Sequence, residues 1–326
     1  ELSCESIFIN ATHTHNAPYT RPTALFRDWL PIAEDVLQPA EYIEFLQNQI
    51  VKAAVNAWNS RKAGAIAAAF ARASIGHCRR AVYKNGTAEM YGDTSREDFI
   101  GMEAGEDSGV EIIFSFDENG KTNGAIINVA CPSQCMEATY EISSDFMGAT
   151  RELLKKEFGE NFNTLCQISS SGCQSPRDLL RRDHSLDFWK AEGVKIIAER
   201  LSKAVISAYS DAEKQKDFSP QFRHTCTRVK LPIRRASYLE YCKAKEDLCR
   251  LLKIQEEKPA YDDFCRELLE NEKIPGRLGP FDSKLHHFVL IKNAQAVLKR
   301  YEEQKENADF SFDMQCLRIG DSAMVN

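Results

Sequence analysis

Two histidines one residue apart are the clearest candidates for chemistry in this sequence. His13 and His15 follow the apolar run Ser6–Asn10, whose composition predicts a short β-strand. In an extended chain, residues two apart point to the same side, so both imidazoles can face one cleft. Two neutral imidazoles suit a divalent metal, or one metal ligand beside a hydrogen-bonding catalytic group. The alternative is that they only form hydrogen bonds in a buried turn.

Three further residues, Arg79, Cys131 and Ser175, have side chains of types that occur in active sites, namely a cation, a thiol and a hydroxyl. Each has a structural alternative when taken alone. Arg79 can form a surface ion pair, Cys131 can be a buried thiol, and Ser175 can be a turn residue before Pro176.

Taken together, the motifs resemble the catalytic N-terminal domain of the neutral/alkaline, non-lysosomal ceramidase superfamily. Their order and spacing hold over residues 6–208, with a looser match beyond. The resemblance rests on these motifs: Thr12-His13-Thr14-His15 before Pro18, Cys78-Arg79-Arg80, Cys131-Pro132, Ser144-Asp145, and Ser171-Gly172-Cys173-Gln174-Ser175-Pro176. It identifies a divergent, bacterial-type member in which Cys-Pro replaces the His-Pro of the family.

The resemblance implies a zinc-assisted hydrolase of an N-acyl (amide) bond in a small-molecule or lipid-like substrate. By position, His13 and Cys131 would be the metal ligands, and His15 a second imidazole at the substrate. Arg79 would stabilise negative charge, and Ser175 would be the nucleophile or an oxyanion contact. Whether serine or water attacks stays open at this point.

The sequence departs from the family pattern at two site positions. Cys131 stands where the family has a zinc-binding histidine, and Cys173 replaces the aspartate before the serine. The remaining family ligands, a glutamate and a tyrosine, would fall past Asn326, so we expect a chain truncated at both ends with an incomplete metal shell. A non-catalytic binding or scaffold protein is therefore the main alternative. A thiol-dependent hydrolase using Cys131 or Cys173 with His15 as base is a third hypothesis.

Composition limits the possible partners and compartments. The net charge of -6 and the pI near 5.8 argue against a nucleic-acid partner, which would favour a basic face. No apolar run is long enough to predict a transmembrane helix. The 11 cysteines show no spacing typical of disulfide frameworks or zinc ribbons. We therefore expect reduced thiols and a cytoplasmic location, with secretion as the alternative. The oligomeric state is not predicted.

The pattern of apolar residues predicts an α/β fold, with a layered mixed β-sheet, flanking helices and a helix-rich C-terminal third. We expect a single domain over residues 1–326, with its best-matching core at 1–208 and a helical insertion with returning strands at 209–326. A helix beginning at Pro39 is expected to pack on a sheet, and an amphipathic piece is expected at 24–30. Strands are expected within 63–74 and at 110–116, 125–129 and 164–168, and further helices at 146–158, 187–209, 238–254, 261–271 and 284–306.

Three of the expected strands lead into polar loops, which contain His13 and His15, Cys131, and Ser175. In a layered α/β fold, loops that leave the same edge of a sheet converge. The sequence therefore predicts that these loops form one pocket.

Overall fold

The computed structural model separates into two compact units. One consists of Glu1–Tyr19, Ile43–Thr225 and Cys316–Asn326, and the other of Thr20–Tyr42 and Cys226–Gln315. The expectation of a single domain with an insertion stays a prediction. The amphipathic piece expected at 24–30 lies outside the described residues. Those described residues are 6–18, 20, 37–137, 139, 141–181, 188–271, 286–304 and 309–325.

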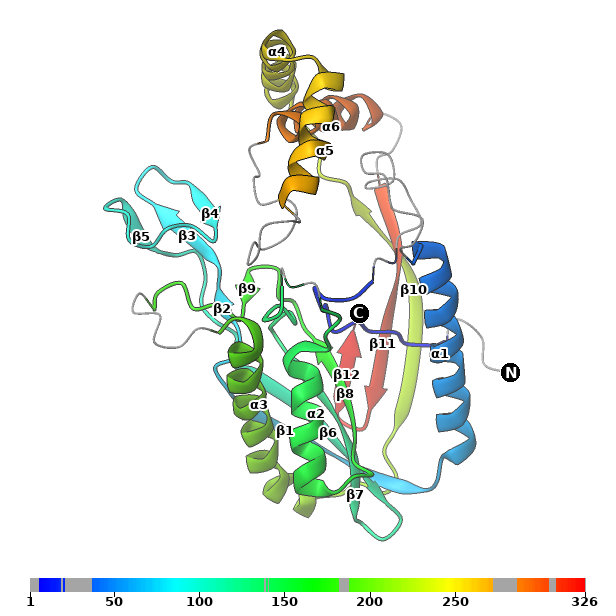
Figure 1. Ribbon diagram of the computed structural model, residues 1–326. Coiled ribbons are helices and arrows are strands. Elements are labelled where there is room, and N and C mark those ends of the chain that lie inside the picture. The colour runs from blue at the N-terminus through cyan, green and yellow to red at the C-terminus, as the bar shows by residue number, and fades with distance from the viewer. Residues whose placement is uncertain are drawn as a thin grey trace. The chain divides into compact units, whose positions relative to one another are not determined.

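A four-stranded mixed sheet forms the centre of the first unit (Figure 1). Its strands, in spatial order, are β1 (Gly64–Arg72), β6 (Gly109–Asp117), β7 (Thr122–Val129) and β8 (Asn163–Ile168). β6 is antiparallel to both β1 and β7, whereas β8 runs parallel to β7. The mixed sheet and its flanking helices confirm the predicted α/β class.

The turn between β6 and β7 follows directly from its sequence. The Asp117 side chain accepts hydrogen bonds from the backbone N–H groups of Asn119 and Lys121. Gly120 has a φ of 78°, a left-handed conformation that glycine adopts without a steric cost. The hairpin predicted here is confirmed.

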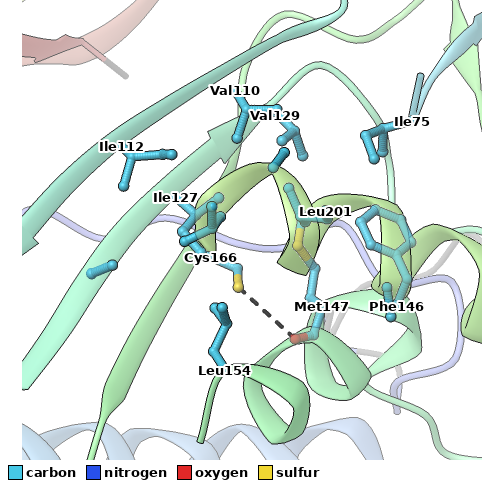
Figure 2. Close-up of a cluster of buried hydrophobic side chains, with 14 of the residues drawn as sticks. Ile75, Val110, Ile112, Ile127, Val129, Phe146, Met147, Leu154, Cys166 and Leu201 are labelled. Carbon is cyan, nitrogen blue, oxygen red and sulfur yellow. Dashed lines mark hydrogen bonds between the residues drawn. The ribbon is translucent and has the colours of Figure 1, made fainter. Parts of the chain in front are cut away.

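Two helices, α2 (Asp145–Phe158) and α3 (Lys190–Ala212), lie side by side on one face of this sheet (Figure 1). The core lies between the sheet and these helices, with Ile112 and Ile127 on one side and Leu154 and Leu201 on the other, each at most 2% exposed (Figure 2). Alternate alanines of β1 are buried in the same core. Helix propensity alone would place this alanine-rich segment in a helix, but pairing with β6 makes it a strand, as predicted.

Short strands lie on either side of Arg79 and contain Ser175. β2 (His77–Cys78) pairs with β9 (Gln174–Ser175). β3 (Arg80–Tyr83) lies between β4 (Ala88–Met90) and β5 (Phe99–Met102) in a separate three-stranded sheet. The β3–β4 hairpin confirms the turn signal of Asn85-Gly86.

Two expectations about the N-terminal part differ from the structure. Residues 7–14 form no strand, and Ile7 and Ile9 are 42% and 62% exposed. β-propensity reflects packing on a sheet, and within the described residues this run pairs with no strand. Helix α1 (Pro39–Ser60) begins at Pro39 as predicted, but none of its residues is buried.

Helices dominate the second unit, as predicted. They are α4 (Tyr238–Ile254), α5 (Glu257–Asn271) and α6 (His287–Glu303). Their apolar faces form a small core that includes Leu251, Phe264 and Ile291. A capping box between Ser237 and Glu240 fixes the start of α4.

The remaining elements are β10 (Phe222–Pro232), β11 (Asp309–Ile319) and β12 (Ser322–Val325), which form a three-stranded sheet, and the short 3₁₀ helix η2 (Glu213–Gln215). Among the helices of the described residues, none is both long enough and apolar enough to cross a membrane.

Replacing a core leucine should destabilise the first unit far more than replacing an exposed one. Leu154 is 0% exposed and Leu165 is 64% exposed. We expect Leu154→Ala to lower the free energy of unfolding by about 2–5 kcal/mol and Leu165→Ala by about 0.5 kcal/mol or less. Urea denaturation followed by circular dichroism measures both. Equal losses would contradict the assigned core.

Candidate functional site

The ends of β7 and β8 bring two loops to the same edge of the main sheet. The strands are parallel, and Val129 lies opposite Ile168 near the end of each. The backbone N–H of Ser169 then donates to the carbonyl of Val129 at 3.1 Å. Because parallel strands end at the same edge, the loop that begins with Ala130 and the loop that leads to Ser175 leave the sheet together.

The histidine loop is attached to the loop that follows β7. The backbone N–H of His15 donates to the Ser133 carbonyl at 3.1 Å, and the Thr14 hydroxyl donates to the Ser143 carbonyl at 2.8 Å. The buried Asn16 amide donates to the carbonyl of Glu141 at 3.1 Å. These bonds hold the two imidazoles in place without a strand.

The rings of His13 and His15 lie together, with their centroids 5.2 Å apart and their planes tilted by 32°. His13 has a φ of 54°, a left-handed conformation that costs free energy in a residue other than glycine. Both imidazoles are therefore on one side of the loop, as predicted, but a strained residue rather than an extended strand places them there.

The charges around the rings favour a neutral His13 and an ionised Glu137. Partial burial, and then the charges of His15 and Arg79, lower the pKa of His13 below its ordinary value of 6.5. Burial acts to raise the pKa of Glu137, but hydrogen bonds from His15 and Gln134 and the charge of Arg79 outweigh it and lower the pKa below 4.5. Nδ1 of His15 lies 3.0 Å from Glu137 Oε1.

The pairing of β2 with β9 brings Arg79 to the serine loop. The backbone N–H of Arg79 donates to the Cys173 carbonyl at 2.9 Å. Its guanidinium donates to the Gly172 carbonyl at 3.0 Å. Ser175 is 0% exposed, and its hydroxyl oxygen accepts from the backbone N–H of Arg177 at 3.2 Å. Arg79 and the Arg177 backbone thus both hold the loop that contains Ser175.

Tyr91 joins these side chains, although the sequence analysis did not select it. Its hydroxyl oxygen lies 3.2 Å from the Arg79 guanidinium, 3.3 Å from Ser175 Oγ and 3.4 Å from Gln134 Oε1. Tyr91 also has a φ of 54°. Backbone strain in residues other than glycine tends to cluster at functional sites. Of the four such residues with a positive φ in the described part of the chain, His13 and Tyr91 lie in this cluster.

A line of polar atoms within hydrogen-bonding distance therefore runs from His15 to Ser175, in which the single Tyr91 hydroxyl proton is donated either to Gln134 Oε1 or to Ser175 Oγ. It passes through Glu137, Gln134 and Tyr91, because Gln134 Nε2 donates to Glu137 Oε2 at 3.0 Å. The structure thus places His13, His15, Arg79 and Ser175 in one cluster. The three connecting residues were missed. Gln134 could have been noticed from its position three residues after Cys131, whereas nothing in the sequence singles out Tyr91.

Cys131 lies in the hydrophobic core rather than in this cluster. It is 0% exposed, and its thiol lies 3.5 Å from the carbonyl oxygen of Ile75. Burial, with a smaller contribution from Asp145, raises the pKa of the thiol well above 9.0. The chain packs tightly here, since a Cβ on Gly76 would lie 2.5 Å from the Ala130 carbonyl oxygen.

These positions do not fit the zinc site that the resemblance implies. Metal binding requires the thiolate, which the surroundings of Cys131 disfavour. His13 and His15 remain as imidazoles that can bind a metal. The Glu137 carboxylate beside His15 resembles the carboxylate that accepts a hydrogen bond from many metal-bound histidines. Within the described ranges, however, no group of three or more His, Cys, Asp or Glu side chains is arranged to hold a metal ion.

Polar atoms with unmet hydrogen-bonding capacity concentrate around the cluster. Of the six buried side-chain atoms without a partner in the described part of the chain, five belong to its segments. They are Asn16 Oδ1, His77 Nε2, Arg79 Nε, Ser133 Oγ and Gln174 Oε1. An unsatisfied buried group costs about 1–3 kcal/mol, so these segments hold their polar atoms at a cost in stability.

The titration of His13 tests the electrostatics of the cluster. We expect its NMR titration midpoint to lie below 6.5, so that the ring is neutral at pH 7. His15→Ala should raise the midpoint because it removes a positive neighbour, whereas His224→Ala on β10 should not change it. A wild-type midpoint at or above 6.5 would contradict the described surroundings.

Alkylation separates the buried thiols from the accessible ones. With iodoacetamide at neutral pH, we expect Cys249, which is exposed, to react in the folded protein. Cys131 and Cys166 should react only after unfolding, because both are buried and burial raises the pKa of each thiol. Peptide mass spectrometry measures the modification. Equal rates for Cys131 and Cys249 in the folded protein would refute the core position of Cys131.

No protein-family profile matches this chain, and no curated protein sequence does.

Structural comparison finds similar solved structures, two ceramidases among them. The neutral ceramidase from Pseudomonas aeruginosa is 14% identical, with a TM-score of 0.52 over 88% of this chain and 44% of that one. A ceramidase complexed with C2 is 15% identical, with a TM-score of 0.52 over 88% of this chain and 45% of that one. The chain thus spans less than half the length of either protein, and at this identity the likeness concerns the fold alone. The chain has a ceramidase-like fold.

Proposed function

We propose that the chain belongs to a hydrolase that cleaves an N-acyl (amide) bond. The observation that supports this most is the hydrogen-bonded arrangement of Arg79, Tyr91 and Ser175. It connects to the two imidazoles at the same edge of a ceramidase-like sheet. A cation, a hydroxyl and imidazoles are among the groups that catalyse acyl transfer.

Each group has a role in this proposal. The Arg79 guanidinium stabilises the negative charge that develops on the acyl oxygen. Ser175 supplies the attacking hydroxyl, and movement of the Tyr91 side chain exposes it to substrate. His13, neutral at pH 7, and the His15–Glu137 pair hold and orient the polar end of the substrate by hydrogen bonds.

Metal assistance, which the resemblance implies, rests in this proposal on His13 and His15 alone. Among the described residues, no group of three or more His, Cys, Asp or Glu side chains is arranged to hold a metal ion, and each role above is assigned to side chains of the chain itself.

The similarity of fold supports a proposal for the substrate class. The two solved structures named above are ceramidases, so we propose a lipid-like N-acyl amide of the ceramide class. The ten cysteines of the described residues are all free thiols, which supports a reducing, cytoplasmic location.

A non-catalytic binding or scaffold protein is the second candidate. The buried position of Cys131 favours it, because that residue stands where the resemblance expects a metal-binding histidine. This candidate predicts saturable binding of a short-chain ceramide without release of fatty acid.

The proposal is tested with a short-chain fluorescent ceramide, by chromatography of the released fatty acid. We expect the wild-type chain to hydrolyse it. Ser175→Ala and Tyr91→Phe should each lower the rate by about 10²-fold or more, because each removes a hydroxyl from the centre of the cluster.

Matched controls separate this effect from loss of folding. Ser202→Ala replaces another buried serine, and Tyr83→Phe removes a buried hydroxyl that donates to the Asp93 carbonyl. Both should keep the wild-type rate. Binding of the ceramide with no turnover by the wild-type chain would favour the scaffold candidate.

A further inference from the structure

A second histidine–carboxylate pair lies beside Ser175 and has no part in the function proposed so far. His77 is 6% exposed, and its Nδ1 lies 2.6 Å from Glu106 Oε1. The ring stacks on Phe188 with a centroid distance of 5.6 Å. The carboxylate and the aromatic ring together fix the orientation of the imidazole.

The carboxylate also fixes which nitrogen carries the proton. An ionised Glu106 can only accept hydrogen bonds, so Nδ1 of His77 must donate. In the neutral ring, Nε2 then carries the lone pair. This Nε2 is buried and has no hydrogen-bond partner in the described part of the chain. It is therefore an oriented proton acceptor without a donor.

The hydroxyl of Ser175 lies on the same face of the strand pair as the His77 ring. His77 and Ser175 are directly opposite each other in the antiparallel pair of β2 and β9. Side chains of such a pair point to the same face, with Cβ atoms about 4.5–5.5 Å apart. Ser175 Oγ accepts hydrogen bonds from the Arg177 backbone and the Tyr91 hydroxyl. Its own proton can therefore be directed to a third group.

His15 is less well placed for this role. It reaches Ser175 only through Glu137, Gln134 and Tyr91. His77 faces the serine with no residue between them in the strand pair. Catalytic hydrogen bonds are often long before substrate binds and shorten in the complex, so the proposed contact requires the Ser175 side chain to turn toward Nε2.

We propose that His77, oriented by Glu106, is the base that activates Ser175, an inference that rests on the N-acyl hydrolysis proposed above. Ser175 Oγ bonds to the acyl carbon while its proton passes to His77 Nε2. The C–N bond then breaks as this proton moves to the leaving amine, which leaves an acyl ester on Ser175. Water gives a proton to Nε2, attacks the ester and releases the fatty acid, and the proton returns to Ser175.

The test compares His77→Gln and Glu106→Gln with a matched control. Glu103 lies in the same segment, its side chain is 42% exposed like that of Glu106, and it pairs with Arg80. We expect His77→Gln to lower kcat for the fluorescent ceramide by about 10²-fold or more with KM unchanged, and Glu106→Gln to lower it less. Glu103→Gln should keep the wild-type kcat. Labelling of Ser175 by a fluorophosphonate should fall in parallel.

The wild-type chain provides a readout that does not depend on folding of the variants. Nitrogen-15 NMR of the histidine rings, at a pH where His77 is neutral, should show its proton on Nδ1. A proton on Nε2 would overturn the inference even in an active protein.

The outcomes separate the two proposals. If His77→Gln hydrolyses ceramide and labels at Ser175 at the wild-type rate, the inference fails and the proposed function stands. If the wild-type chain neither hydrolyses ceramide nor labels at Ser175, the proposed function fails and the inference fails with it.

Discussion

The parallel register of β7 and β8 is the constraint on which the site depends. Val129 and Ile168 are paired near the ends of these strands, so the two following loops must leave at one edge. One loop holds the histidine segment through the Ser133 and Ser143 carbonyls. The other leads to β9, whose pairing with β2 brings in Arg79. Residues that are far apart in sequence meet because two strands end together.

Charge and hydrogen bonding then decide the state of each group. The Arg79 cation helps to keep His13 neutral and Glu137 ionised. The same guanidinium contacts the Tyr91 hydroxyl, which lies within hydrogen-bonding distance of Ser175 Oγ. One positive charge therefore organises both the imidazoles and the serine, and the carboxylates of Glu137 and Glu106 orient two different histidines.

The sequence allowed prediction of the elements whose cause is local. The turn after Asp117, the hairpin at Asn85-Gly86 and the helix from Pro39 all follow from turn and helix-start chemistry. Ser6–Asn10 was wrongly expected to be a strand because β-propensity requires a partner strand. Tyr91 and His77 were missed for a related reason. Their importance arises from contacts with residues more than 80 positions away, and composition and spacing do not report such contacts.

The close contact at Gly76 limits how such a site can be remodelled. A side chain there would collide with the Ala130 carbonyl oxygen and would separate β2 from the end of β7, displacing both His77 and Arg79. Gly172 is the opposite case, since a Cβ there would meet no atom within 4 Å. An engineer who wants to change the shape of this edge should therefore leave position 76 alone and vary position 172, where new bulk can be added without moving the scaffold.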